Sequence, residues 1–226
     1  MTTLAGQTVL VTGANRGMGR EYVTQLLDRG VTKVYAAARD PRSIDHDDPR
    51  VVALQLDVAD PASIAAAAEV ATDVGVLINN AGIALMTQVL EPDTTSLRAE
   101  LETNLFGPLA LASAFSDRIA ERTGAIVNVA SILAWLPGGS YGVSKAALWS
   151  ATNAMRAELA PRGVQVVGVY VGLVDTDMAS FTPASAKSRP EDVIRQVLDG
   201  IESGANEVLA DEMTRHVRAE LGKPIA

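Results

Sequence analysis

Short runs of aliphatic, often β-branched residues alternate along the chain with longer segments that mix alanine with polar residues. The short runs are almost continuously apolar, a pattern typical of strands covered on both faces of a sheet. They predict strands at residues 8–11, 33–37, 51–56, 74–79, 125–129, 164–170 and 207–209.

The longer segments predict helices, because residues that favour helix ends stand at their limits. Asp60 and Pro61 suit the N-cap and first position of one helix, while Gly30 and Gly163 follow the ends of two others. The predicted helices are residues 17–28, 61–71, 96–120, 141–160 and 190–203, with another from Asp211 onward.

Strands that alternate with helices predict β-α-β units, and therefore a doubly wound parallel sheet with helices on both faces. Two irregular polar segments, residues 39–50 and 172–189, do not interrupt the alternation. We therefore expect residues 1–226 to form a single α/β domain with a sheet of about seven strands.

Composition removes several classes of function. The 226 residues carry a net charge of -8, which disfavours binding to a nucleic-acid backbone. The chain has no cysteine, which excludes a disulfide framework, a thiolate metal site and a cysteine nucleophile. His46 and His216 are not at ligand spacing, so we expect no metal site. No apolar run approaches about 20 residues and no signal-peptide pattern is present, so we expect a cytoplasmic protein without membrane contact.

A glycine-rich turn, TGANRGMG from Thr12 to Gly19, follows the first predicted strand and precedes a helix. Glycines there allow a tight bend and let backbone N–H groups approach a pyrophosphate at the positive end of the helix. The turn therefore predicts a dinucleotide site, with an ordinary glycine-rich turn as the alternative. The predicted contacts in it are Gly13, Asn15, Arg16, Gly17, Met18 and Gly19.

The end of the second predicted strand bears on which dinucleotide binds. The residue that contacts the adenosine ribose is expected about 20 residues after the glycine turn, where Arg39 stands, followed by Asp40. A guanidinium binds a 2′-phosphate through charge-assisted, often bidentate contacts, and Arg16 would bind the same phosphate from the turn. We expect NADP as the cofactor, but NAD remains an alternative because Asp40 could bind the ribose hydroxyls. Two solvated surface arginines are the alternative.

Tyr141 and Lys145 lie near the start of a predicted helix at i, i+4 spacing, which places the phenol and the ammonium on one face. A phenol with a pKa of about 10 exchanges protons poorly at neutral pH. A neighbouring cation favours the phenolate and brings the pKa closer to the working range. Next to a dinucleotide site, the pair is a candidate for acid–base catalysis.

Together these features resemble the short-chain dehydrogenase/reductase superfamily over essentially the whole chain. The resemblance rests on the glycine turn, Asp57, Asn79-Asn80-Ala81-Gly82, Asn104, Ser131 and Tyr141-x-x-x-Lys145. The segments TGANRG and AAARD also resemble the NADP-preferring carbonyl reductase branch. The resemblance implies a Rossmann-type sheet in the order 3-2-1-4-5-6-7, with the cofactor at the carboxyl ends of the strands and a homodimer or homotetramer as the assembly.

The resemblance also implies a reaction, the reversible NADPH-dependent reduction of a ketone or aldehyde to an alcohol. Tyr141 would exchange a proton with the substrate oxygen, and Ser131 would hydrogen-bond to that oxygen. Lys145 would lower the pKa of Tyr141 and hold the nicotinamide ribose, while Asn104 would hold a water that links Lys145 to solvent. The other implied cofactor contacts are Asp57, Val58, Asn80, Ala81, Gly82 and Thr176.

Some of these residues have structural alternatives, and two segments depart from the family pattern. Asn104 would otherwise be a kink inside a helix, and Asp57 a cap of the turn after its strand. Residues 132–140 are fewer than usual between Ser131 and Tyr141, which leaves the geometry of Ser131 open, with Ser140 as a substitute. Val171-Gly172 replaces the usual Pro-Gly, which we expect to loosen the turn that positions Thr176.

Two other functions compete with the reductase. Gly138-x-Ser140-x-Gly142 fits the nucleophile elbow of α/β-hydrolases, although Leu-Pro-Gly rather than a strand precedes the serine. A catalytically impaired NAD(P)-binding regulator or scaffold of the same fold is the second alternative.

The substrate is indicated only in outline. Residues 179–189, which we expect to cover the substrate pocket, are rich in alanine, serine and proline. Trp135 falls in the shortened segment 132–140, which we expect to form one wall of that pocket. They predict a small-molecule carbonyl or alcohol substrate that is compact and apolar.

Overall fold

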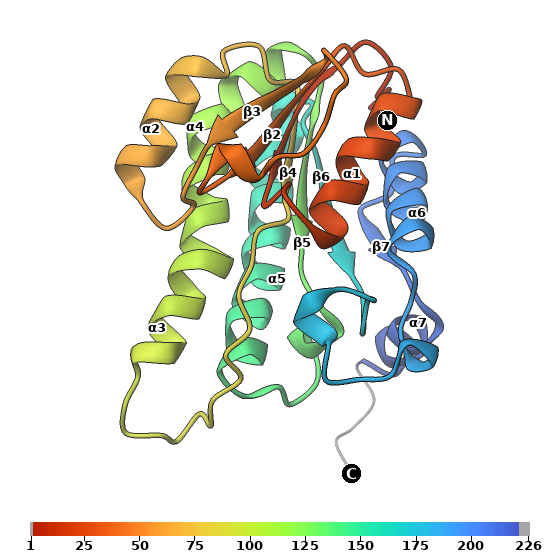
Figure 1. Cartoon of the computed structure of the whole chain (residues 1–226). Helices are drawn as coiled ribbons and strands as arrows, with labels where there is room; N and C mark the ends of the chain where they lie inside the picture. Colours follow the sequence, from red (N-terminus) through yellow and green to blue (C-terminus); the bar gives the residue numbers. More distant parts are fainter. Residues whose placement is uncertain (1, 222–226) are drawn as a thin grey trace.

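The computed structural model describes residues 2–221, whose strands form one parallel sheet in the order β3-β2-β1-β4-β5-β6-β7 (Figure 1). The predicted α/β class, the seven strands and their order are confirmed, and strand ends differ by one or two residues. The strands are β1 (Thr8–Thr12), β2 (Lys33–Ala38), β3 (Val51–Gln55), β4 (Val76–Asn79), β5 (Ala125–Val129), β6 (Gln165–Tyr170) and β7 (Glu207–Leu209).

Helices cover both faces of this sheet (Figure 1). Because successive strand residues point to opposite faces, Val9 of β1 packs into the core beneath α1 and α6, and Leu10 into the core beneath α2, α4 and α5. The helices are α1 (Gly17–Asp28), α2 (Pro61–Val70), α3 (Thr95–Leu101), α4 (Gly107–Glu121), α5 (Gly139–Leu159), α6 (Pro190–Glu202) and α7 (Glu212–Glu220).

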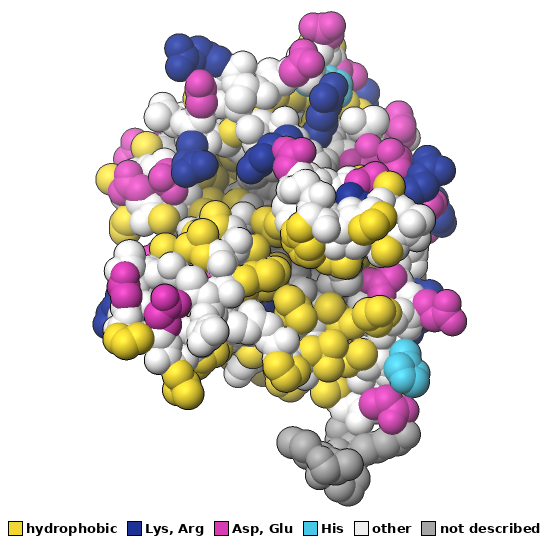
Figure 2. Space-filling view, turned by 60° about the horizontal axis from the view of Figure 1, so that its bottom comes forward, with side chains coloured by type: hydrophobic (Ala, Val, Ile, Leu, Met, Phe, Trp, Pro, Cys, Tyr) yellow, Lys and Arg dark blue, Asp and Glu magenta, His cyan; other side chains and the backbone are white. Residues whose placement is uncertain are grey.

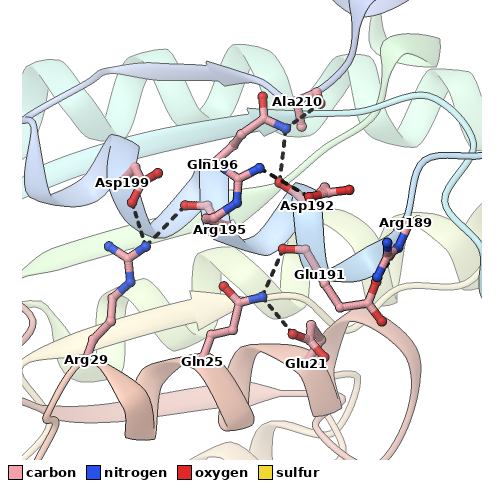
Figure 3. A network of polar contacts seen from close by, with 10 residues as sticks. All are labelled: Glu21, Gln25, Arg29, Arg189, Glu191, Asp192, Arg195, Gln196, Asp199 and Ala210. Atoms are coloured by element: carbon pink, nitrogen blue, oxygen red, sulfur yellow. Dashed lines mark hydrogen bonds and ion pairs between the residues drawn. The ribbon is translucent and has the colours of Figure 1, made fainter.

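A seam of polar contacts joins α1 and α6 on their solvent side (Figure 3). Arg29 forms an ion pair with Asp199 at 2.6 Å, and the Gln25 amide donates to the Glu191 carbonyl at 2.9 Å. The seam fixes α1, whose first residues form the glycine-rich turn.

The structure corrects the prediction of one uninterrupted helix over residues 96–120. A π-helical turn, Glu102–Phe106, separates α3 from α4. Such turns are rare and are frequently found at functional sites. The fully buried Asn104 lies within this turn, so the helix is irregular at the residue for which the sequence offered a kink as the alternative role.

Parallel strands bring their carboxyl ends to the same edge of the sheet, and the strand order reverses between β1 and β4. Doubly wound sheets bind ligands in the crevice at this reversal. The segments after β1, β4, β5 and β6 all carry predicted site residues. Within residues 2–221, no helix has the length and apolar character needed to cross a membrane.

Candidate active site

The glycine turn after β1 has the tight geometry that its sequence predicts. Gly13 and Gly17 have φ values of +64° and +53°, in the left-handed region that favours glycine. A side chain on Gly19 would collide with the carbonyl oxygen of Gly13, so this position too requires glycine.

The turn is attached to the end of β4 by two polar side chains. The Asn80 amide donates to the carbonyl oxygens of Thr12 and Gly13, at 2.9 and 3.3 Å. The Thr12 hydroxyl accepts hydrogen bonds from the backbone N–H groups of Asn80 and Ala81, both at 3.0 Å. Asn80 therefore holds the turn in shape, a role that the sequence did not indicate.

The N-terminus of α1 keeps N–H groups available for an anion. Arg16 is the N-cap residue, and among the described residues no side chain caps this helix end and no acidic residue lies in its first turn. Unpaired N–H groups and the helix dipole favour a phosphate at such a position.

A cavity of about 630 Å³ opens between the glycine turn and the carboxyl ends of the strands. It contains every cofactor contact that the sequence predicted except Tyr141 and Lys145. Those lining residues are Gly13, Asn15, Arg16, Gly17, Met18, Gly19, Arg39, Asp57, Val58, Asn80, Ala81, Gly82 and Thr176.

The two residues after β2 differ in their availability. Asp40 accepts two hydrogen bonds from the Arg42 guanidinium, at 2.9 and 3.0 Å, and these bonds hold the pKa of its carboxyl below the usual value. Arg39 is exposed, and the described part of the chain gives its guanidinium no ion-pair partner. Of the two, Arg39 is therefore the group free to bind a ligand.

Arg16 is not free in the same way. It forms an ion pair with Asp177 at 2.9 Å, between two exposed side chains that both line the cavity. Exposed pairs of this kind stabilise a protein by about 0–1 kcal/mol, so a bound phosphate competes with it easily. Of the two arginines predicted to bind the 2′-phosphate, Arg39 is therefore free and Arg16 is paired with Asp177.

Asp57 lies where a cofactor contact is expected and also caps the turn after its strand. It lines the cavity, and its carboxylate also accepts a hydrogen bond from the Ala59 N–H at 3.0 Å. The carboxylate therefore caps the turn after β3.

Tyr141 and Lys145 lie on the first two turns of α5, which begins at Gly139 rather than at Tyr141. Both are buried, and the Lys145 ammonium lies 5.6 Å from the centroid of the Tyr141 ring. Lys145 also donates to the carbonyl oxygen of Val129, the last residue of β5, at 2.8 Å. The helix thus brings both residues to the end of β5.

Ser131 stays beside Tyr141 despite the shortened segment between them. It caps the short 3-10 helix Ile132–Ala134 by accepting from the Leu133 N–H at 3.2 Å. Its hydroxyl is close enough to Tyr141 for a hydrogen bond that lowers the pKa of the phenol.

Burial dominates the titration of both catalytic candidates. It raises the pKa of Tyr141 to about 12, helped by the negative charge of Glu100 and opposed by the hydrogen bond with Ser131. Burial also lowers the pKa of Lys145 to about 8, because the interior disfavours the ammonium. At neutral pH the phenol is therefore protonated in the free protein.

Asn104 connects the π-helical turn to the rest of the site. Its Oδ1 accepts from the Ile83 N–H and its amide donates to the Ser144 hydroxyl, both at 2.9 Å. A Cβ atom on Gly82 would lie 3.1 Å from Asn104 Oδ1 and 3.5 Å from Lys145 Nζ. The missing side chain at position 82 therefore leaves a small space that both Asn104 and Lys145 border.

Trp135, in the segment before α5, packs against the sheet. Trp135 stacks on Tyr170, with ring centroids 4.4 Å apart, and is not among the residues that line the cavity. The ring packs against Tyr170 of β6 and does not border the cofactor cavity; its predicted place in the wall of the substrate pocket stays a prediction.

Ser140 does not have the surroundings of a hydrolase nucleophile. It is buried in the first turn of α5, and no strand among the described residues leads into it. Its hydroxyl accepts hydrogen bonds from the Thr87 N–H and hydroxyl, at 3.0 and 3.1 Å. The serine therefore binds the loop after β4, and the nucleophile elbow is excluded.

The turn after β6 is held by hydrogen bonds, although it lacks the usual proline. The Gly172 N–H donates to the Asp211 carboxylate at 2.7 Å, and the Asp175 N–H to the Ser188 carbonyl at 2.9 Å. These two hydrogen bonds restrain the turn that positions Thr176, where the missing proline is expected to loosen it. Thr176 faces the glycine turn, since its side chain would lie 3.2 Å from a Cβ on Gly17.

Comparison with known proteins agrees with this architecture. A family model for short chain dehydrogenase matches residues 7–187. The chain is 34% identical over 182 residues to short-chain dehydrogenase PC-15 of Penicillium crustosum, covering 75% of this chain and 66%, just under two thirds, of that protein. It is 32% identical over 234 residues to ketoacyl reductase HetN of a Nostoc species, covering 94% and 81%.

A solved structure extends the likeness to three dimensions. The short chain dehydrogenase from Burkholderia cenocepacia J2315 in complex with NADP is 39% identical, with a TM-score of 0.93 and coverage of 99% of this chain and 95% of that one. With the family model and the shared fold in agreement, the chain belongs to the short-chain dehydrogenase family.

Proposed function

We propose that the protein reduces a ketone or an aldehyde to an alcohol, reversibly, with NADPH as the hydride donor. The observation that carries the proposal is the convergence of Tyr141, Ser131 and Lys145 at the end of β5. Of these, Lys145 lies next to Gly82, which lines the cavity formed by the glycine turn.

The cavity suits NADP. The uncapped N-terminus of α1 fits a pyrophosphate, and the free guanidinium of Arg39 fits a 2′-phosphate. Asp40, the group that would favour NAD, is engaged by Arg42. The similar protein from Burkholderia cenocepacia is in complex with NADP. When bound, NADPH supplies the hydride.

The polar residues then handle the proton. With its pKa raised to about 12, Tyr141 is protonated at neutral pH and donates its proton to the substrate oxygen. Ser131 donates a hydrogen bond to the same oxygen, and the Lys145 ammonium stabilises the phenolate that forms. Asn104 holds a water between itself and Lys145, through which the proton returns from solvent.

We propose a compact and apolar carbonyl compound as the substrate. Figure 2 shows hydrophobic side chains gathered around a hollow, on the face formed by the segments after β4, β5 and β6. The exposed apolar side chains of these segments include Leu85, Met86, Leu136, Met178 and Phe181.

The family resemblance further supports one domain over the 226 residues and a homodimer or homotetramer. The alternative of an impaired regulator or scaffold depended on the shortened segment after Ser131. Since Ser131 remains beside Tyr141, no observation favours that alternative.

The experiment follows the oxidation of NADPH by the purified protein with a panel of aliphatic aldehydes, ketones and β-keto esters, and of NADH in parallel. We expect turnover with several uncharged carbonyls and a preference for NADPH. No oxidation of either nucleotide above the rate without protein, for any carbonyl, would contradict the proposal.

A further inference from the structure

A fully buried carboxylate holds the loop after β4. Glu100 of α3 has no exposed surface, and its Oε1 accepts from the backbone N–H groups of Leu85 and Met86, at 2.6 and 3.1 Å. Its Oε2 is buried without a hydrogen-bond partner, and no cation of the described residues pairs with it. Burying such a group is unfavourable, so its position calls for a role other than general stability.

The next residue of the loop is held from the other side. The Thr87 N–H donates to the Ser140 hydroxyl at 3.0 Å, and the Ser140 N–H donates to the Thr87 carbonyl at 2.9 Å. Gly139 makes this approach possible, because it has a φ of +58° and a Cβ there would lie 2.6 Å from the Thr87 oxygen. Residues 85–87 are thus held between α3 and the first turn of α5.

The backbone of the loop is strained where it is held. Met86 has a φ of +55°, which is unfavourable for a residue with a side chain. Such strain persists only where the surroundings enforce it, and it is typical of functional sites. As a result, Leu85 and Met86 expose their side chains on the apolar surface around the hollow. Ser140, which holds Thr87, directly precedes Tyr141 in the sequence.

We propose that Glu100 is a positioning residue for the substrate. By fixing residues 85–87, it holds the apolar wall formed by Leu85 and Met86 at a set distance from Tyr141. The wall then selects carbonyl compounds by the shape of their apolar part. This inference rests on the proposed reductase function for its kinetic test, but not for its structural test.

The kinetic test compares Glu100→Leu, which removes the acceptor, with Glu100→Gln, which retains an acceptor oxygen in a similar shape. Losing two hydrogen bonds to a charged acceptor should raise the KM for the best carbonyl by about tenfold or more. We expect Glu100→Gln to recover most of this loss and kcat to change less than KM. The Kd for NADPH, measured by fluorescence titration, should stay unchanged in both variants.

Glu102→Leu is the matched control, because Glu102 is exposed two positions further along. It should leave the KM unchanged. If Glu100→Leu does not fold, Ser140→Ala replaces it, since this change weakens the same loop from the α5 side. An unchanged KM in a folded Glu100→Leu or Ser140→Ala variant would overturn the proposal, as would equal losses in the Gln and Leu variants.

The structural test measures amide hydrogen exchange over residues 85–87 and needs no turnover. We expect faster exchange in Glu100→Leu and exchange near that of the unsubstituted protein in Glu100→Gln. Equal protection in all three proteins would overturn the inference. If the unsubstituted protein reduces no carbonyl, the proposed function fails, and the exchange result still decides whether Glu100 fixes the loop.

Discussion

Arg39 and Asp40 show how neighbouring residues at the end of β2 decide the cofactor. Because Arg42 occupies Asp40, the unpaired Arg39 should dominate this end of the cavity. Changing Arg39→Asp removes a charge-assisted contact with the 2′-phosphate and should raise the KM for NADPH by about tenfold to a hundredfold. Steady-state kinetics with both nucleotides checks this.

The matched control for Arg39→Asp is Arg20→Ala, which changes an exposed arginine of α1 whose ion pair with Asp45 is as long as 3.8 Å. It should leave both KM values unchanged. An NADPH/NADH preference in Arg39→Asp equal to that of the unsubstituted protein would contradict the assignment of the 2′-phosphate to Arg39.

The lowered pKa of Lys145 should make the free energy of unfolding depend on pH. Its pKa is about 8 in the folded protein, against 10.5 for a freely solvated lysine side chain, so between these values the unfolded chain binds more protons. The free energy of unfolding should therefore rise with pH, by about 2 kcal/mol from pH 7.5 to 9.5. Urea denaturation of the ligand-free protein should show this rise relative to Lys145→Met, which lacks the titrating group. Parallel pH dependences of the two proteins would refute the depressed pKa.

Single residues also show the limit of sequence reasoning. Tyr141 and Lys145 were identifiable as candidates from their i, i+4 spacing on a helix, and Ser131 and Asn104 through the family resemblance. Their partners were not, since nothing in the sequence tells that a buried Glu100 meets the loop after β4. One signal was available for Arg42: Asp40-Pro41 has the form of a helix N-cap, which turns the chain back and brings the guanidinium onto the carboxylate.

At the scale of elements, apolar runs predicted the strands well because both faces of the sheet are buried. The helices were predicted less completely. Residues 96–120 have the apolar spacing of one helix, and the π-helical turn within them is set by the contacts of Asn104 with Ile83 and Ser144. These contacts join residues distant in sequence, so local pattern cannot reveal them.

The helix α7 has a role that its place near the end of the described chain does not suggest. Asp211 caps it by accepting from the Thr214 N–H at 2.8 Å, and also accepts from the Gly172 N–H at 2.7 Å. One carboxylate therefore secures both α7 and the turn that leads to Thr176. This contact restrains the turn from which the usual proline is missing.

Asp211→Ala should accordingly destabilise the protein by about 2–4 kcal/mol, since it removes a helix cap and leaves the Gly172 N–H without its partner. Asp60→Ala is the control, because Asp60 caps α2 through the Ala62 N–H alone and should cost about 1 kcal/mol. Chemical denaturation of both variants checks the difference. Equal losses would show that the contact with Gly172 contributes nothing.

For the whole molecule, the site is made entirely by segments that leave the carboxyl ends of parallel strands. β1 leads to the glycine turn, β4 to Asn80 and Gly82, β5 to Ser131, and β6 to Thr176. The parallel α/β sheet was predictable from alternation and the strand order from the family resemblance, and together they bring these segments to one edge of the sheet. The shape of the substrate pocket was not, because it depends on loops whose conformations are set by tertiary contacts such as those of Glu100 and Ser140.

The central claim is that Tyr141 supplies the proton in a reduction by NADPH. The most direct measurement is the turnover of Tyr141→Phe with the best carbonyl of the panel, together with its Kd for NADPH. The account predicts a fall in kcat of about a hundredfold to ten-thousandfold, the usual contribution of an acid–base group, with the Kd nearly unchanged. A Tyr141→Phe variant that retains the kcat of the unsubstituted protein would contradict the account.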